Sequence, residues 1–158
     1  MQSSSPMHYK AADGSWEEIE YKLKGRAGKF TFPMQNPIFG FEKNTTSIMV
    51  GAQKILIEGN TVFKFVSQGD TSEKSVNSSR VNPILTSDNS LLYHGVSTAV
   101  DKAVSVYSGA LKYDYVINAA TALPQGFDKM IIEDVIEVPS GFSIVKNNNQ
   151  VVIIDAKT

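Results

Sequence analysis

Short apolar segments separated by turn residues recur along most of the chain, and this spacing constrains the fold more than any other feature. The C-terminal third shows it clearly, because apolar runs over 130–138, 142–146 and 150–155 are separated by Pro-Ser-Gly and by three asparagines. Short runs rich in Val and Ile, bounded by Gly, Pro and Asn, are typical of β-strands. We therefore expect a mainly β protein with about eight to ten short strands, folded as a sandwich or a barrel-like structure.

Several other segments carry the same signal. Asp13-Gly14 predicts the turn of an N-terminal β-hairpin. Segment 45–69 predicts a three-stranded meander, because its β-branched runs are separated by Gly51-Ala52 and Gly59-Asn60. Segment 111–118 alternates between apolar and polar residues, which predicts a further strand.

One stretch predicts a helix instead. Apolar residues recur at a spacing that places their side chains on one face of a helix: Val96, Val100, Ala103 or Val104, Tyr107 and Leu111. Ser97 or Thr98 would cap its first turn. We expect this helix, over about 97–108, to be the only one.

The composition of the first part of the chain predicts a different organisation from the rest. Segment 25–41 holds three glycines and two prolines, which disfavours a central strand or a helix, and it also carries four phenylalanines. We expect residues 1–44 to form an extended hairpin and an aromatic Pro/Gly-rich arm. Residues 45–158 would form a β-rich core domain with a long polar loop over 70–90.

Composition also excludes several kinds of chemistry. The 158 residues include no cysteine, so disulfides, zinc–thiolate sites and thiol catalysis are excluded. The net charge is −1 and no basic run exists, so we expect neither nucleic acid nor a membrane surface as a partner. No cofactor motif is present, and the two histidines are far apart, so we expect no cofactor and no metal centre.

Two further expectations concern calcium binding and cellular location. The oxygen-rich segments 67–73 and 86–90 have a composition that could form a calcium loop, although polar loops of this composition are far commoner than calcium sites. No signal-peptide pattern and no apolar run of membrane-spanning length is visible, so we expect synthesis in the cytoplasm of a host cell.

The stretch Leu-Tyr-His-Gly at 92–95 raises an enzymatic hypothesis. Followed by the predicted helix, it resembles the entry segment of ADP-ribosyltransferase toxins, which implies that Tyr93 and His94 line a nicotinamide pocket. The chain departs from that family downstream, because no Gln-x-Glu or Glu-x-Glu motif follows Leu111. The alternative is that His94 is a hydrogen-bonded residue at a strand end.

A second resemblance, in the general pattern of segments rather than in a diagnostic motif, extends over most of the chain. The opening "MHYKAADGSWEEI", the meander and the ending "IEVPSGFSIVKNNNQVVIIDAKT" together look like small bacteriophage virion proteins of the capsid decoration, head-fibre or tail-fibre type. This resemblance implies a structural protein that forms homo-oligomers, often trimers, on a larger virus particle and acts by binding to itself and to other virion proteins. The interface anchors would be apolar residues of the N-terminal arms, with an ordinary core role as the alternative for the phenylalanines: Met7, Tyr9, Phe30, Phe32, Phe39 and Phe41.

A third hypothesis is a carbohydrate-binding module. Such modules present exposed aromatic rings in a row, and Trp16 with Tyr9 and Tyr21 could supply one. Trp16 alternates with Ile19 and Tyr21 onto the opposite face of the predicted strand, which favours its exposure.

Overall fold

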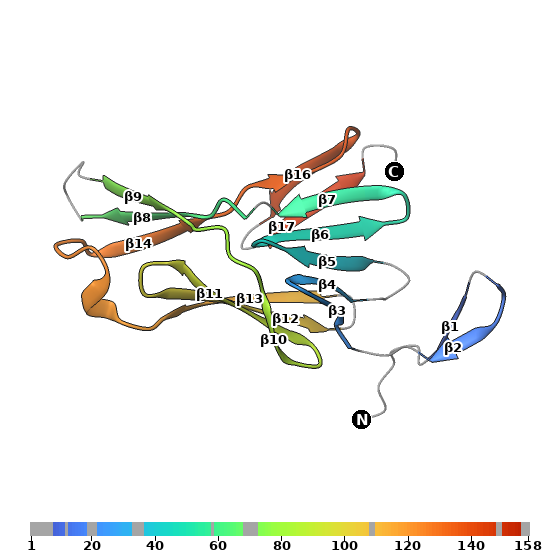
Figure 1. The fold of residues 1–158 in the computed structure, drawn as a ribbon. Coiled ribbons are helices and arrows are strands. Elements are labelled where there is room, and N and C mark those ends of the chain that lie inside the picture. The colour runs from blue at the N-terminus through green and yellow to red at the C-terminus, as the bar shows by residue number, and fades with distance from the viewer. Residues whose placement is uncertain are drawn as a thin grey trace, which may run out of the picture.

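The computed structural model describes residues 8–11, 13–18, 22–32, 37–57, 59–67, 73–107, 110–147 and 150–155. Over these residues the predicted mainly β architecture is confirmed, with seventeen short strands and one 3-10 turn at Ala120–Ala122. The strands form five sheets, none of which closes into a barrel, and the result is a β-sandwich-like fold (Figure 1). No helix among these residues is long and apolar enough to cross a bilayer.

The largest sheet has six antiparallel strands in the order β15-β7-β6-β5-β4-β3. Most neighbours in it follow one another in the chain and are joined by tight turns, so the sheet is a meander with one added edge strand. Its strands are β3 (Lys24–Arg26), β4 (Lys29–Phe32), β5 (Ile38–Glu42), β6 (Thr45–Val50), β7 (Gln53–Ile57) and β15 (Ile136–Glu137).

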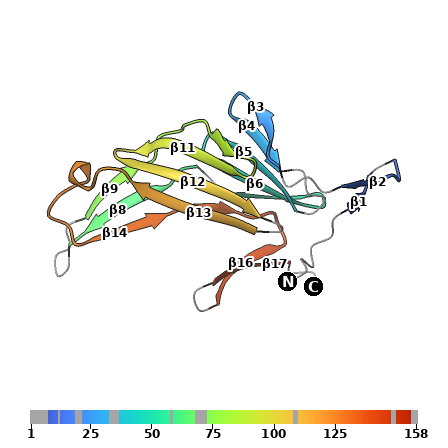
Figure 2. The same ribbon diagram turned by 90° about the horizontal axis from the view of Figure 1, so that it is seen from below.

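Two further sheets complete the sandwich. A four-stranded sheet in the order β10-β11-β12-β13 lies against the others, as the view from below shows (Figure 2). A three-stranded sheet, β14-β8-β9, extends the large one, because β8 follows β7 and β14 precedes β15 in the chain. The strands are β8 (Val62–Val66), β9 (Glu73–Asn77), β10 (Ile84–Ser87), β11 (Ser90–Ser97), β12 (Val100–Tyr107), β13 (Ala110–Ile117) and β14 (Lys129–Glu133).

The core lies between these layers and is rich in aromatic residues. Phe32 of β4 and Phe63 of β8 are both 0% exposed. Phe63 meets the edge of Tyr115 from β13, with ring centroids 5.7 Å apart and planes at 86°, an arrangement that aromatic pairs favour. The core therefore joins the four-stranded sheet to the other two.

The predicted aromatic arm is wrong. Phe30, Phe32, Phe39 and Phe41 are buried in this chain's own core, and the strands that carry them are central in the six-stranded sheet. They alternate with outward residues, and the prolines at 33 and 37 fall between the two strands rather than within them. The predicted boundary at residue 44 falls in the turn between the paired strands β5 and β6, so it does not separate two units.

The predicted helix over 97–108 is also wrong, because Val100–Tyr107 is strand β12. Val100, Lys102, Val104 and Val106 are buried with a period of two, which is the period of a strand. A two-residue turn at Thr98-Ala99 joins β11 to β12, and Ala99 has a φ of 59° there. Valines at positions 100 and 104 fit both the helical period of about 3.6 and the strand period of two, but β-branched residues favour the strand.

The predicted polar loop over 70–90 is shorter than expected. Glu73–Asn77 forms β9 and Ile84–Ser87 forms β10, so the connection between them spans only 78–83. The side chains of β9 and β10 are mostly exposed, which explains why the segment has a loop-like composition. Residues 70–72 lie outside the described part.

Two hairpins form separate sheets at the periphery (Figures 1 and 2). The predicted N-terminal hairpin is confirmed, with a turn in which Ser15 N–H donates to Asp13 Oδ1 at 2.9 Å and Gly14 has a φ of 88°. A second hairpin ends the described chain. The strands are β1 (His8–Lys10), β2 (Trp16–Glu18), β16 (Phe142–Asn147) and β17 (Gln150–Asp155).

Candidate functional site

Tyr93 and His94 point to opposite sides of β11. Tyr93 is fully buried, whereas the His94 side chain is 74% exposed on the outer face of the four-stranded sheet. His94 Nδ1 lies 3.0 Å from Asp101 Oδ2, and Gly95 N–H donates to Asp101 Oδ1 at 2.7 Å. Burial acts to raise the pKa of Asp101, but hydrogen bonds from Gly95, Asn118 and His94 outweigh it and hold the pKa below its usual value. The pair thus closes a β-bulge, and the two residues do not share a pocket.

The buried face of the same sheet carries an unexpected lysine. Lys102 is only 1% exposed, and its cross-strand neighbours are Tyr93 on β11 and Tyr115 on β13. Its Nζ lies 4.7 Å from the ring centroid of Tyr113 and 5.9 Å from those of the other two tyrosines. No described hydrogen-bond acceptor reaches that Nζ. The lysine is therefore enclosed by three aromatic rings.

Polar groups of the opposite layer face this lysine and its tyrosines. Tyr115 donates to Asp134 Oδ2 at 3.0 Å, and Thr61 Oγ1 donates to the other oxygen of the same carboxylate. The hydroxyls of Tyr93, Tyr113 and Thr46 are buried and have no hydrogen-bond partner among the described atoms. Burial of polar groups without partners is costly.

Burial also shifts the titration of this cluster. It lowers the pKa of Lys102, with Asp134 opposing the change. It raises the pKa of Tyr113 to about 12, and it raises the pKa values of Tyr93 and Tyr115 further. In each case the low-dielectric surroundings disfavour the charged form.

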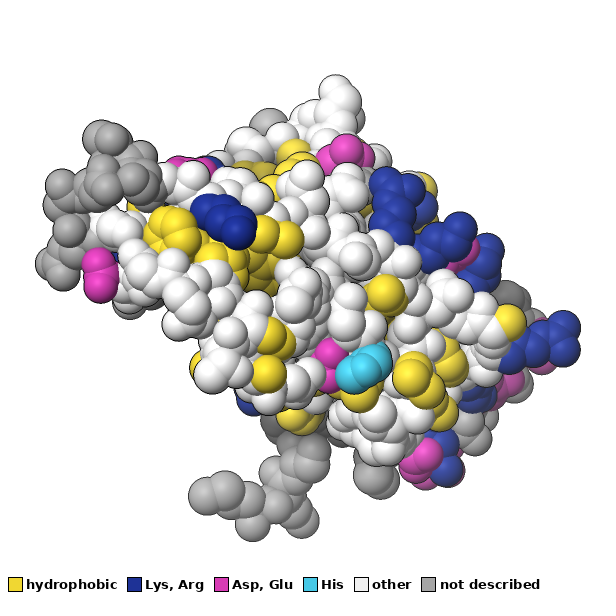
Figure 3. All heavy atoms as spheres, turned by 60° about the vertical axis from the view of Figure 1, so that its left-hand side comes forward, with side chains coloured by type: hydrophobic (Ala, Val, Ile, Leu, Met, Phe, Trp, Pro, Cys, Tyr) yellow, Lys and Arg dark blue, Asp and Glu magenta, His cyan; other side chains and the backbone are white. Residues whose placement is uncertain are grey.

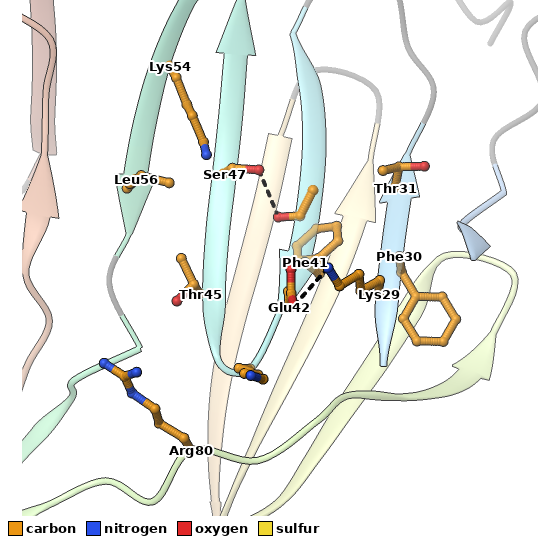
Figure 4. Close-up of a pocket in the computed structure, with 12 residues that line it drawn as sticks. Lys29, Phe30, Thr31, Phe41, Glu42, Thr45, Ser47, Lys54, Leu56 and Arg80 are labelled. Carbon is orange, nitrogen blue, oxygen red and sulfur yellow. Dashed lines mark hydrogen bonds and ion pairs between the residues drawn. The ribbon is translucent and has the colours of Figure 1, made fainter. Parts of the chain in front are cut away.

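A separate site lies on the outer face of the six-stranded sheet. Residues that alternate with the core phenylalanines point outward here, in rows fixed by the strand register: Thr31, Gly40, Ser47 and Leu56 form one row. Lys29, Glu42 and Thr45 form the adjacent row. These residues, with Lys43, Lys54 and Arg80, line a groove of about 460 Å³ (Figure 4).

Gly40 forms the floor of this groove. A Cβ at position 40 would lie 2.6 Å from Ser47 Oγ, and Ser47 Oγ donates to the Gly40 carbonyl at 3.4 Å. The absence of a side chain at Gly40 therefore keeps a hollow open between β4 and β6. Figure 4 shows Lys54 at one end of the groove, beside Ser47, and Arg80 at the opposite end, past Thr45, while Lys29 reaches toward Glu42.

Asn44 positions the loop that carries Arg80. Lys43 and Asn44, with φ values of 46° and 68°, form the two-residue turn between β5 and β6. The buried Asn44 side chain donates to the Ser79 carbonyl at 2.5 Å and accepts from Val81 N–H at 3.2 Å. Both bonds flank Arg80, so this one side chain fixes one wall of the groove.

Replacing Asn44 by alanine is expected to lower the free energy of unfolding by about 1–2 kcal/mol. Alanine disfavours the left-handed conformation and leaves the Ser79 carbonyl and Val81 N–H without their partner. Urea unfolding measures the change, and Lys43→Ala, at the exposed neighbouring turn position, is the control. Equal stability of the Asn44 variant and the wild type would contradict this role.

The C-terminal hairpin β16–β17 is apolar on both faces. Ile144 pairs with Ile153 on one face, and Val145 lies on the other face together with Ile154. Ile144, Val145 and Ile154 are 44%, 41% and 42% exposed. We call this hairpin the C-terminal ribbon.

The other predicted site residues lie apart from these sites. Trp16 is 71% exposed on the N-terminal hairpin, Met7 and Tyr21 lie outside the described residues, and of Tyr9 only the backbone is described. The oxygen-rich segment 86–90 forms the β10–β11 turn, and the described residues contain no group of three or more acidic or histidine side chains placed to hold a metal ion. The segment 67–73 is described only at its ends.

Comparisons of the chain with models of protein families, with curated proteins and with solved structures give no match.

Proposed function

We propose that the chain is a structural protein of a virus particle, of the capsid decoration or fibre-attachment type, which acts by self-association and binding without catalysis. The C-terminal ribbon carries this proposal. A two-stranded hairpin alone is marginally stable in water, and strands that are apolar on both faces are typical of strands buried on both faces. One face of the C-terminal ribbon can pack on its own chain. The apolar side chains of the other face then need a second protein surface to be buried.

A second copy of the same chain is the occupant that we propose. Every copy supplies one ribbon, so the contacts repeat around a closed oligomer, for which a trimer is the stoichiometry expected from the resemblance to virion proteins. The four-stranded sheet offers a complementary surface. Its edge strand β13 is eight residues long, pairs only with β12 in the described sheet and exposes Val116 and Ile117. A long edge of this kind is a template for strand addition.

The test is a ribbon variant with one apolar side chain replaced on each face, Ile144→Ser with Ile154→Ser. Burial of one isoleucine contributes about 1.5–3 kcal/mol, so we expect the dissociation constant of the oligomer to rise by at least about tenfold. Sedimentation velocity over a range of concentrations measures the change.

The matched control is Ile84→Ser on β10, which removes an exposed isoleucine far from β13 in strand order. It should sediment like the wild type. Circular dichroism and thermal unfolding show whether the sandwich stays folded in both variants. An unaltered oligomer in the folded double variant would contradict the role of the ribbon.

A further inference from the structure

We propose that the groove on the six-stranded sheet binds a saccharide that carries a phosphate or sulfate ester. This inference does not depend on self-association. The first observation is charge. Four cationic side chains and one carboxylate line the groove, and Lys29 is paired with that carboxylate, Glu42, at 3.1 Å. Lys43, Lys54 and Arg80 have no ion pair with an acid in the described part of the chain.

The whole chain is nearly neutral, so this excess of cations is local. The formal net charge is −1 with 15 basic and 16 acidic residues, whereas three cations without a described counter-charge line one groove. Figure 3 shows most of the Lys and Arg side chains on the face that it presents along its right-hand side, with some acidic side chains among them. A local cluster of this kind favours an anionic group over a neutral ligand.

The groups between the cations indicate the rest of the ligand. The hydroxyls of Thr31, Thr45 and Ser47 lie along the floor and walls, and Glu42 supplies a hydrogen-bond acceptor. The two phenylalanines at the groove are core residues, so no exposed ring among the described lining residues offers a stacking surface for a nucleobase. Hydroxyl and carboxylate partners suit the hydroxyls of a sugar.

The geometry places a cationic side chain toward each end of the groove, so an anionic group can bind at either end. Arg80 is held by the two Asn44 hydrogen bonds on either side of it, and Lys54 extends from β7 toward Ser47 (Figure 4). Arginine and lysine together are a common pair of phosphate and sulfate ligands, with arginine giving directional bonds and lysine a point charge. A groove of about 460 Å³ is within the usual size range of small-ligand sites.

The experiment compares four probes by calorimetry and by amide chemical-shift mapping: inorganic phosphate, a disaccharide with one phosphate ester, the same disaccharide with one sulfate ester, and the unmodified disaccharide. We expect one or both esters to bind more tightly than inorganic phosphate and the unmodified disaccharide, with shifts at Gly40, Thr45 and Ser47. The ester that binds more tightly shows whether the groove prefers a phosphate ester or a sulfate ester. Equal binding of the unmodified disaccharide, or no binding of either ester, would overturn the proposal.

A charge variant links binding to the groove. Lys54→Gln with Arg80→Gln should weaken the binding of the preferred ester by about tenfold or more. Lys112→Gln with Lys129→Gln removes the same charge from β13 and β14 and should change binding by less than about twofold. Equal loss in the two variants would mean that only long-range attraction binds the ester, which would overturn the groove as its site. Single-stranded DNA is a fifth probe, and its tighter binding than either ester would overturn the saccharide assignment.

Discussion

Replacing Lys102 by methionine is expected to raise the free energy of unfolding at pH 7, by up to about 4 kcal/mol, the upper end of the range found when buried ion pairs are replaced by apolar groups of similar volume. Lys102 is only 1% exposed, and its buried ammonium group has no described hydrogen-bond acceptor. Cation–π contacts with three tyrosine rings offset part of the desolvation free energy. Only the Tyr113 ring is close, with its centroid 4.7 Å from Lys102 Nζ. Methionine fills similar space and keeps the contacts with the rings.

The same variant should change how stability depends on pH. The pKa of Lys102 is lowered in the folded state, so between that lowered pKa and the ordinary value of 10.5 the unfolded chain binds more protons. The stability of the wild type should therefore rise with pH over this window, and that rise should be absent in the Lys102→Met protein.

Urea unfolding at several pH values measures both effects. Lys112→Met is the control, because Lys112 lies on the outer face of the same sheet and pairs with Asp114 at 2.9 Å. That variant should differ from the wild type by less than about 0.5 kcal/mol. Loss of stability in the Lys102→Met protein would show that the lysine contributes favourably to the core.

The second large effect is expected in alkali. The pKa of Tyr113 is raised to about 12, and those of Tyr93 and Tyr115 are raised further, so above pH 10 these three tyrosines lose protons in the unfolded chain first. Each contributes a fall of about 1.4 kcal/mol in stability per pH unit, or about 4 kcal/mol per unit together. A domain of ordinary stability would then unfold cooperatively near pH 11–12.

Absorbance at 295 nm, which reports phenolate, and circular dichroism test this expectation together. Half of the six tyrosines should titrate only as the sheet signal is lost. Tyr113→Phe should remove about one third of the alkaline slope, since it removes one of the three buried hydroxyls whose pKa is raised. Smooth titration of all tyrosines in the folded protein would contradict the buried cluster.

The parts of the fold that were predicted correctly depend on local signals. The Asp13-Gly14 hairpin, the pairing of β6 with β7 and the C-terminal strands follow from turn residues and short β-branched runs, which act within a few residues. The three-stranded meander predicted over 45–69 is wrong in its third strand, because β8 pairs with β9 and β14 instead of β7. The strand at 100–107 also fits a helical pattern, because its valines at 100 and 104 satisfy both the helical and the strand period. The inward residue between them, Lys102, is polar, so the sequence does not show the alternation of apolar residues that marks a strand.

The two sites could not be predicted because they depend on pairing between strands. The aromatic cage of Lys102 needs the register that places Tyr93, Lys102 and Tyr115 in one row. The groove likewise needs Gly40 beside Ser47 and needs Asn44 to fix the loop of a residue 36 positions away, Arg80. The alternation of Phe30, Phe32, Phe39 and Phe41 was a local sign of strands, but the prolines near them favoured an irregular arm.

The native mass of the purified chain, measured by light scattering at several concentrations, tests the central claim of self-association most directly. The proposed assembly role predicts a closed oligomer, with a trimer as the expected stoichiometry, whose mass stays constant over a wide range of concentration. A monomer at every concentration would contradict self-association through the C-terminal ribbon.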